Sequence, residues 1–217
     1  MAVITVSRQL GSHGARIARA LAKELGYAFA DKALINRVIR QYGLTRLDVI
    51  YDHKPKIWEL FNDNSAATIE MMNQTIAAIA ARGNVVILGR GGFRVLQEMT
   101  DVLNVFVKAS DITRARRIGK RDGIDTDEAA ELIKTDDELR SRFVRLFYGA
   151  DWADESAYDL VLDTSDASDA DACAQVVDAV HALPEPGASD RQAANLEVDP
   201  VLAQTVAQAM ARRVARV

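Results

Sequence analysis

The sequence has little cysteine: Cys173 is alone among 217 residues. Because no disulfide can form within the chain, a reducing compartment is favoured, and we expect a cytoplasmic protein. The chain also lacks any run near the ~20 apolar residues that a membrane helix needs, and it lacks the basic start of a signal peptide. Positive charge is not in excess, since 27 Lys and Arg face 31 Asp and Glu, for a net charge of −4. We therefore expect neither a nucleic-acid nor a membrane partner.

Metal-ligating residues are sparse as well. The histidines His13, His53 and His181 lie far apart in sequence, and with Cys173 they show none of the spacings typical of a metal site. We expect no metal ion held by these side chains. Any phosphate site has to be built locally, because the overall charge does not attract anions.

Apolar β-branched runs alternate with stretches of helical spacing along most of the chain. Strands are expected at 2–6, 84–88, 103–108 and 158–162. Helices are expected at 15–25, 32–42, 66–81, 93–98, 112–120, 126–147 (as one helix or two) and 169–181. The stretch 44–64 is mixed in pattern. This alternation predicts one α/β domain of three layers, with a parallel sheet covered by helices on both faces.

The C-terminal part has a different composition. Residues 184–195 are rich in Pro, Gly, Ala and Ser and resemble a linker, and Asp199 with Pro200 suits the start of a helix over 201–214. We therefore divide the chain into a domain at 1–183 and a linker with an extra helix at 184–217. We expect this helix to pack on the chain's own core; an arm of a homodimer is the alternative. Since the core elements end by His181, removal of 184–217 should leave the core folded.

The turn after the first strand reads Ser-Arg-Gln-Leu-Gly-Ser-His-Gly-Ala-Arg over 7–16. A glycine-rich turn between a strand and a helix can hold phosphate on its N–H groups. Compared with the P-loop pattern G-x-x-x-x-G-K-[ST], Arg8 takes the place of the first Gly and His13 that of the second. Gly14 then stands for the Lys and Ala15 for the Ser or Thr, so Lys and Thr restored there should raise ATP affinity. On pattern alone, a structural turn is as good an interpretation as a phosphate site.

Several segments resemble the cytidylate kinase-like family in order and spacing. They are the loop Ser-Arg-Gln-Leu-Gly-Ser-His-Gly at 7–14, Ala-Asp-Lys-Ala-Leu-Ile at 30–35, Val-Ile-Leu-Gly-Arg-Gly at 86–91, Asp-Glu-Leu-Arg at 137–140, Tyr-Gly-Ala-Asp-Trp at 148–152 and Tyr-Asp-Leu-Val-Leu-Asp-Thr-Ser at 158–165. The resemblance covers roughly 2–181. It implies a fold of the P-loop kinase type with a helical lid, and phosphoryl transfer from ATP, with Mg²⁺, to a nucleoside monophosphate such as CMP or dCMP.

The resemblance also implies site residues. ATP phosphates would lie on the loop, against Arg8, Gln9, Gly11, Ser12, His13, Gly14 and Arg16. The acceptor would contact Asp31, Lys32, Arg37, Arg90, Asp137 and Arg140. Arginine offers a planar donor fork that matches phosphate oxygens, and a carboxylate can accept from the amine of cytosine. As alternatives, Arg37 and Arg140 are solvated helix residues, and Asp137 pairs with Arg140 or caps a helix.

The expected lid carries arginines at helical spacing. Arg114, Arg117 and Arg121 share one face, and the resemblance implies that they close over the nucleotide as catalytic cations. The alternative is a solvated surface helix with ion pairs to the flanking acids.

Some residues depart from the family pattern. The P-loop Lys and hydroxyl are absent, Gly91 stands where cytidylate kinases carry Asp, and Leu88 gives the strand end no carboxylate. Two usual magnesium anchors are therefore missing. One of Arg8, Arg16 or the lid arginines has to replace the lysine if the chain transfers phosphate. Otherwise the chain is a nucleotide-binding protein with a degenerate P-loop and little or no kinase activity.

Overall fold

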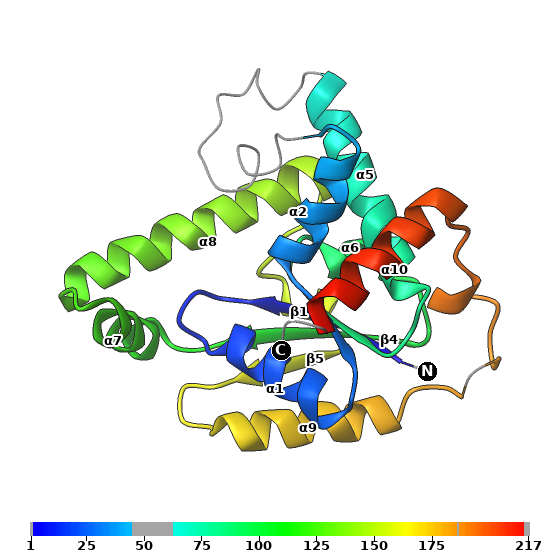
Figure 1. Cartoon of the computed structure of the whole chain (residues 1–217). Helices are drawn as coiled ribbons and strands as arrows, with labels where there is room; N and C mark the ends of the chain where they lie inside the picture. The colour runs from blue at the N-terminus through cyan, green and yellow to red at the C-terminus, as the bar shows by residue number, and fades with distance from the viewer. Residues whose placement is uncertain (1, 45–62, 186, 215–217) are drawn as a thin grey trace.

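The computed structural model describes residues 2–44, 63–185 and 187–214. Its centre is a five-stranded parallel sheet in the order β2-β3-β1-β4-β5 (Figure 1). The strands are β1 Val3–Arg8, β2 Ala28–Ala30, β3 Val85–Leu88, β4 Val102–Lys108 and β5 Leu160–Asp163. The predicted three-layer α/β fold with a parallel sheet is confirmed.

The sheet is buried on both of its faces, which explains its apolar strands. Along β1, Val3 packs into the cluster on one face, whereas Ile4 and Val6 pack into the cluster on the other. A strand covered on both sides is a continuous apolar run rather than an alternating one. Thr5 and Ser7 are buried polar exceptions, and the Thr5 hydroxyl donates to Asn104 Oδ1 at 2.7 Å inside the core.

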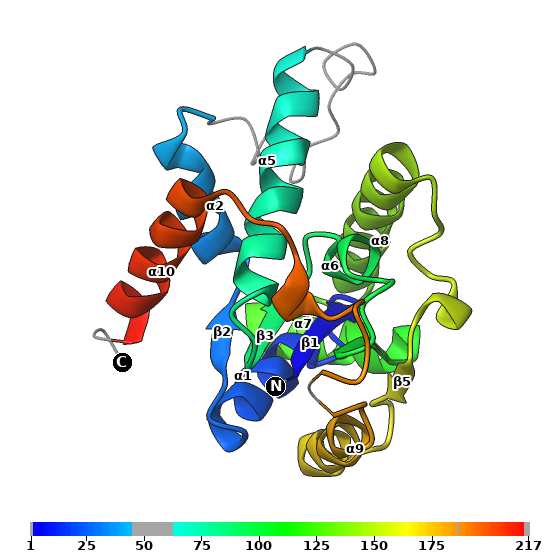
Figure 2. The same cartoon turned by 90° about the vertical axis from the view of Figure 1, so that its right-hand side faces the viewer.

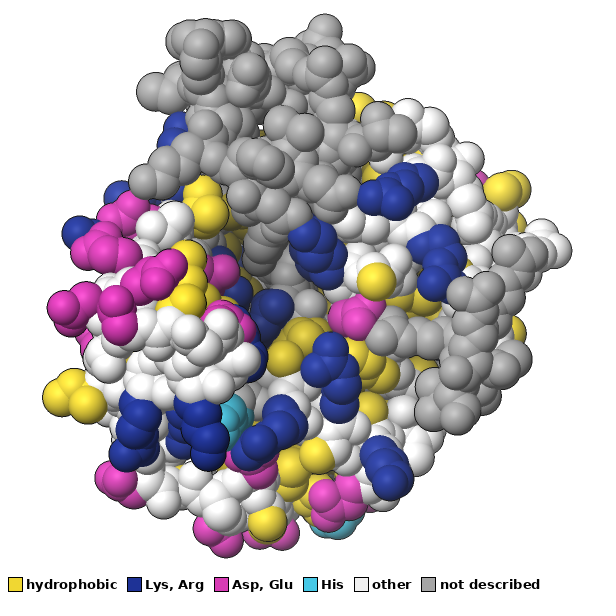
Figure 3. All heavy atoms as spheres, turned by 60° about the vertical axis from the view of Figure 1, so that its left-hand side comes forward, with side chains coloured by type: hydrophobic (Ala, Val, Ile, Leu, Met, Phe, Trp, Pro, Cys, Tyr) yellow, Lys and Arg dark blue, Asp and Glu magenta, His cyan; other side chains and the backbone are white. Residues whose placement is uncertain are grey.

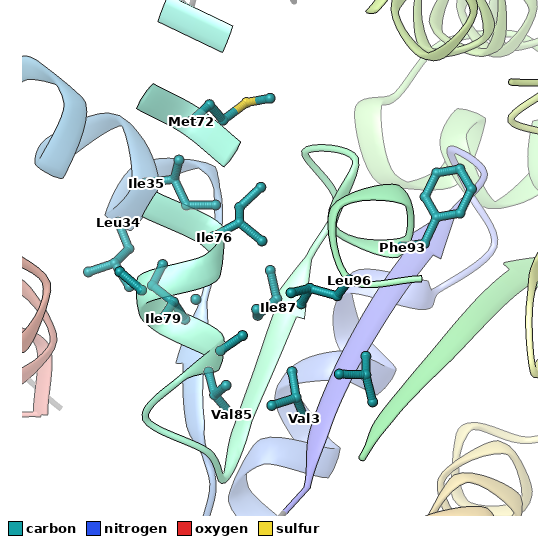
Figure 4. Close-up of a cluster of buried hydrophobic side chains, with 14 of the residues drawn as sticks. Val3, Leu34, Ile35, Met72, Ile76, Ile79, Val85, Ile87, Phe93 and Leu96 are labelled. Atoms are coloured by element: carbon teal, nitrogen blue, oxygen red, sulfur yellow. The ribbon is translucent and has the colours of Figure 1, made fainter. Parts of the chain in front are cut away.

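Helices cover the two faces in two groups. Helices α1 Gly14–Glu24 and α9 Asp169–His181 lie together on one face. The other face carries α2 Lys32–Gln41, α5 Asp63–Ala80, α6 Gly92–Val95 and α10 Pro200–Val214 (Figures 1 and 2). Figure 4 shows side chains of α2 and α5, among them Ile35 and Ile76, lying over Ile87 of β3.

The remaining two helices project beside the carboxyl ends of the strands (Figure 1). Helices α7 Asp111–Asp122 and α8 Thr126–Tyr148 pack on one another. They share a small apolar cluster of Ala115, Ile118, Ala129 and Ile133, against which Leu10 of the loop after β1 packs. The predicted helical lid therefore exists as a hairpin that touches the loop.

The predicted elements agree with the observed ones to within a few residues. The stretch 126–147 forms one helix, and 93–98 shortens to the single turn of α6. The strand β2 was not predicted, and most of the mixed stretch 44–64, with His53, lies outside the described residues. In the described part of the chain, no helix is long and apolar enough to cross a membrane.

The C-terminal segment is part of the core. Ala193, Leu202, Val206 and Ala209 are buried in the same cluster as the side chains of α2 and α5, so packing on the chain's own core is confirmed. Before α10, the Ala193 N–H donates to Asp101 Oδ1 at 2.7 Å. The expectation that the core is complete by His181 is therefore wrong, because the residues beyond 183 supply buried apolar side chains.

We expect Leu202→Ala to lower the free energy of unfolding by about 2–5 kcal/mol, because it removes buried methyl groups and leaves a cavity. Leu202 is 2% exposed, whereas its neighbour Val201 is 62% exposed. The control Val201→Ala should therefore change stability by no more than about 0.5 kcal/mol. Urea unfolding measures both variants, and equal effects would contradict the packing of α10 on the core.

Candidate functional site

The loop between β1 and α1 has the backbone of a phosphate cradle. Gly11 and His13 take left-handed conformations, with φ of 83° and 63°, and α1 begins at the next residue, Gly14. The first turn of α1 contains no acidic residue. The positive end of the helix and its unsatisfied N–H groups therefore face the loop, as an anion site requires. The turn is fixed from outside by Thr164, whose hydroxyl donates to Ser12 O at 2.8 Å.

A cavity of about 470 Å³ lies over this loop, and we call it the loop cavity. Its cationic lining consists of six arginines, Arg8, Arg16, Arg19, Arg117, Arg121 and Arg140. Gln9, Gly11, His13 and Gly14 of the predicted phosphate site line it too, and Ser12 is buried beneath. Figure 3 shows this face of the molecule, with Lys and Arg side chains around a hollow. The described lining includes no Asp or Glu, so the cavity suits an anion.

A second cavity, of about 740 Å³, lies between α1 and α2 next to the end of β3, and we call it the α1–α2 cavity. It brings together three predicted acceptor residues, Asp31, Lys32 and Arg37. Asp31 also caps α2, because its Oδ1 accepts from Ala33 N at 3.1 Å and from Leu34 N at 3.2 Å. Arg8, Ala15 and Arg19 line both cavities, so the two spaces meet at these residues.

Arg90 lies behind the α1–α2 cavity rather than on its lining. The side chain is 2% exposed, and its Nη2 donates to Asn36 Oδ1 at 3.3 Å. Asn36 in turn lines the cavity. Sequence reasoning missed Asn36, because a lone asparagine inside a helix carries no pattern of its own.

The arginines of α7 point to different places. Arg117 and Arg121 line the loop cavity, and Arg117 also donates to Gly11 O at 3.3 Å and to Thr164 O at 2.6 Å. Arg114 is buried instead, and it donates to Asp137 Oδ2 at 2.7 Å and to Asp111 Oδ1 at 2.6 Å. Arg114 Nη1 also donates to Leu10 O of the loop at 3.4 Å. Of the three lid arginines, only Arg117 and Arg121 line the loop cavity.

Asp137 and Arg140, which were predicted to act together, also have different partners. Asp137 forms its ion pair with Arg114 and lines a third cavity, of about 530 Å³, rather than the α1–α2 cavity. Burial raises the pKa of Asp137, and the charges of Arg114 and Arg140 oppose that rise. Arg140 pairs with Asp136 at 2.7 Å and donates to the backbone oxygen of Arg8. Both alternatives for Asp137, a pair with Arg140 or a helix cap, differ from the observed ion pair, whose partner Arg114 comes from the other helix of the hairpin.

His13 and Arg16 both approach a carboxylate that the sequence did not suggest. Asp169, at the start of α9, lies 3.1 Å from His13 Nδ1 and forms an ion pair with Arg16 Nε. Burial lowers the pKa of His13, and the nearby charges of Arg117 and Arg16 add to this. A lowered pKa keeps the imidazole neutral at pH 7, so His13 adds no charge to the loop cavity.

The residues at the loop do not fit a magnesium ion held by the protein. A P-loop metal site needs a hydroxyl in the first turn of the helix and a carboxylate at a strand end. Here these places hold Ala15 and Leu88. Among the described residues, no group of three or more His, Cys, Asp or Glu side chains could hold a metal ion. The positive charge at the loop cavity comes from its six arginines.

Comparisons with known proteins identify relatives over most of the chain. The model of the cytidylate kinase-like family matches residues 3–166. A cytidylate kinase of Pyrobaculum aerophilum is 33% identical over 172 residues, which cover 79% of this chain and 89% of that protein. A cytidylate kinase of Ignicoccus hospitalis is 31% identical over 169 residues, with 76% and 91% covered.

Two solved structures share the fold. A protein from Eubacterium ventriosum, described as uncharacterized, matches with a TM-score of 0.68 at 18% identity, covering 84% of this chain and 99% of that one. The shikimate kinase of Bacteroides thetaiotaomicron matches with a TM-score of 0.51 at 17% identity, again covering 84% and 99%. At such identities the likeness shows the fold alone.

The left-handed backbone of His13 yields a stability prediction. We expect His13→Ala to be less stable than His13→Gly by about 1 kcal/mol, because a Cβ is strained at positive φ. Both variants lose the same imidazole, so the pair isolates the backbone. Thermal and denaturant unfolding measure the difference, and an alanine variant at least as stable as the glycine variant would contradict the loop conformation.

Proposed function

The chain belongs to the cytidylate kinase-like family, and from this we propose that it transfers a phosphoryl group from ATP to a nucleoside monophosphate, CMP or dCMP. Two adjacent cavities at the carboxyl edge of the sheet, which meet at Arg8, support the proposal. A phosphoryl-transfer enzyme has to hold donor and acceptor phosphates next to each other. The preference for cytidine nucleotides rests on the relatives that are named cytidylate kinase.

In this proposal the triphosphate of ATP occupies the loop cavity. The N–H groups of the loop and the start of α1 hold its phosphates, and Arg117 and Arg121 approach from α7. The acceptor occupies the α1–α2 cavity, with its phosphate against Arg37 and Lys32. The two anions then meet where the cavities join. Arginine suits this task because its fork matches two phosphate oxygens at once.

The reaction needs no nucleophile from the protein. An oxygen of the acceptor phosphate forms a bond to the γ-phosphorus of ATP while the bond to the β,γ-bridging oxygen breaks. ADP leaves with that bond's electron pair, and the acceptor becomes a diphosphate. The protein contributes position and positive charge, so its arginines are the catalytic groups.

Arg114 and Asp137 take supporting roles in this proposal. Their ion pair joins α7 to α8. The Arg114 backbone also lies close under the loop, because a Cβ on Gly11 would come within 2.9 Å of Arg114 O. The pair therefore holds the lid hairpin against the phosphate loop. Arg90 similarly positions Asn36, which lines the acceptor cavity, through its hydrogen bond to Asn36 Oδ1.

A second candidate is a nucleotide-binding protein with little or no kinase activity. It is favoured by the missing magnesium anchors at Ala15 and Leu88. The two candidates differ in product formation and agree in binding, so one experiment separates them.

That experiment is a panel of nucleoside monophosphates tested with ATP and Mg²⁺, read for binding by calorimetry and for diphosphate by chromatography. We expect CMP and dCMP to bind and to be converted to their diphosphates. Binding without diphosphate would support the second candidate. Binding of none of the nucleotides, ATP included, would contradict both.

We expect Arg37→Ala to raise the KM for the monophosphate by about tenfold or more, since a lost charge-assisted hydrogen bond costs about 1.5–3 kcal/mol. The KM for ATP should stay close to that of the parent. The matched control is Arg82→Ala, which removes an exposed arginine that lines neither cavity. Steady-state kinetics measures both, and an unchanged acceptor KM in Arg37→Ala would contradict the placement of the acceptor.

A further inference from the structure

Gly14 is a glycine because of another residue of the loop. A Cβ built on Gly14 would lie 2.5 Å from Arg8 Cβ, 3.1 Å from Arg8 Cγ and 3.1 Å from Val107 Cβ, so the contact with Arg8 is the closest. The two Arg8 atoms are the base of its side chain, close to the backbone of β1, and cannot swing away. A P-loop lysine at position 14 and an arginine at position 8 therefore exclude each other. The expectation that Lys at position 14 with Thr at position 15 would raise ATP affinity overlooks this contact, because the lysine side chain would clash with Arg8.

The far end of Arg8 is seated just as closely. A Cβ on Gly89, the first residue after β3, would lie 2.2 Å from Arg8 Nη1. The guanidinium thus lies against the bare backbone of Gly89, across from the end of its own strand. At the other end, the backbone oxygen of Arg8 accepts from Arg140 Nη1. Arg8 is consequently held at its backbone and at the base of its side chain, at the centre of the carboxyl edge.

The position of Arg8 is also where the two cavities meet. Of the three residues that line both cavities, Ala15 is apolar and Arg19 is directed elsewhere. Arg19 Nη1 donates to Ala15 O at 3.3 Å, and its guanidinium carbon lies 5.5 Å from the centre of the Phe29 ring. Arg8 is therefore the cation best placed between a donor phosphate on the loop and an acceptor phosphate between α1 and α2.

We propose that this loop differs from a P-loop by an exchange at two positions. Arg8 stands at the first glycine and Gly14 stands at the lysine, and Arg8 supplies the positive charge that the lysine supplies in a P-loop. The proposal rests on the proposed function and names the catalytic cation of that same site. The Arg8 guanidinium contacts the γ-phosphoryl group as it passes from ATP to the acceptor. Gly14 and Gly89 have no side chains and so leave room for this arginine.

The test is a reciprocal exchange with the variants Arg8→Gly, Gly14→Lys and the double variant carrying both. Arg8→Gly should lower kcat by on the order of 10³-fold or more, with a smaller change in ATP affinity. The double variant should regain about tenfold or more of that loss. Gly14→Lys alone should melt at a lower temperature than the double variant, because only in the single variant do the lysine and the base of the Arg8 side chain clash. Arg116→Ala, an exposed lid arginine outside both cavities, is the control.

Parent-like turnover in Arg8→Gly, or a double variant no more active than Arg8→Gly, would overturn the exchange. Arg8→Met keeps the bulk of the stem and removes the charge, so it replaces Arg8→Gly should that variant fail to fold. If the unmodified protein shows no turnover, the proposed function is contradicted, and the exchange is tested by ATP affinity instead. In that case Arg8→Gly should bind ATP about tenfold more weakly and the double variant should recover, whereas equal affinities would overturn the exchange.

Discussion

The hydrogen bonding of β1 on both of its sides determines where the site lies. The strand pairs with β3 on one side and with β4 on the other, so the loop that follows Arg8 emerges at the middle of the carboxyl edge. Backbone contacts then fix its neighbours, since Gly89 N donates to Val6 O at 3.0 Å and Gln9 N donates to Val107 O at 3.0 Å. Both cavities take their positions from this ladder. The side chains that line them decide only what the cavities can hold.

Sequence patterns predicted the helices and strands in which buried residues recur at regular spacing. Helix α9 was found at its observed bounds, because its buried residues Ala172, Cys173, Val176 and Val180 recur at helical spacing. The strand Ala28–Ala30 was missed because three residues carry no periodicity; it exists by pairing with Val85–Ile87. The packing of α10 on the chain's own core was predicted, but the surface that receives it was not, since that surface comes from distant helices.

The sequence predicted which types of residue form the site better than it predicted which residues contact one another. The Gly-rich turn and the arginines near it were expected, and Arg37 and Arg117 do line the cavities. Helical spacing placed Arg114 with Arg117, yet the packing of α8 draws Arg114 away to Asp137, 23 residues on. The same limit applies to Asp169, 156 residues from His13. Such pairings depend on how elements dock, and one sequence contains no record of that.

In the proposed function, the charge of the loop cavity takes the place of the metal anchors of a P-loop. Several arginines around one space repel each other unless acids offset them, and Asp169, Asp122 and Asp136 do so for Arg16, Arg121 and Arg140. These carboxylates hold the guanidinium groups from outside the cavity lining. Arg16 and Arg121 are exposed, and exposed ion pairs contribute only about 0–1 kcal/mol, so a polyphosphate can compete for these two donors at little cost. A cation held in this place would be repelled by the six arginines of the lining. The loss of the hydroxyl and the carboxylate at Ala15 and Leu88 and the accumulation of arginines are therefore consistent with one another: in the proposed function, fixed guanidinium groups take over the neutralisation that a metal site would share.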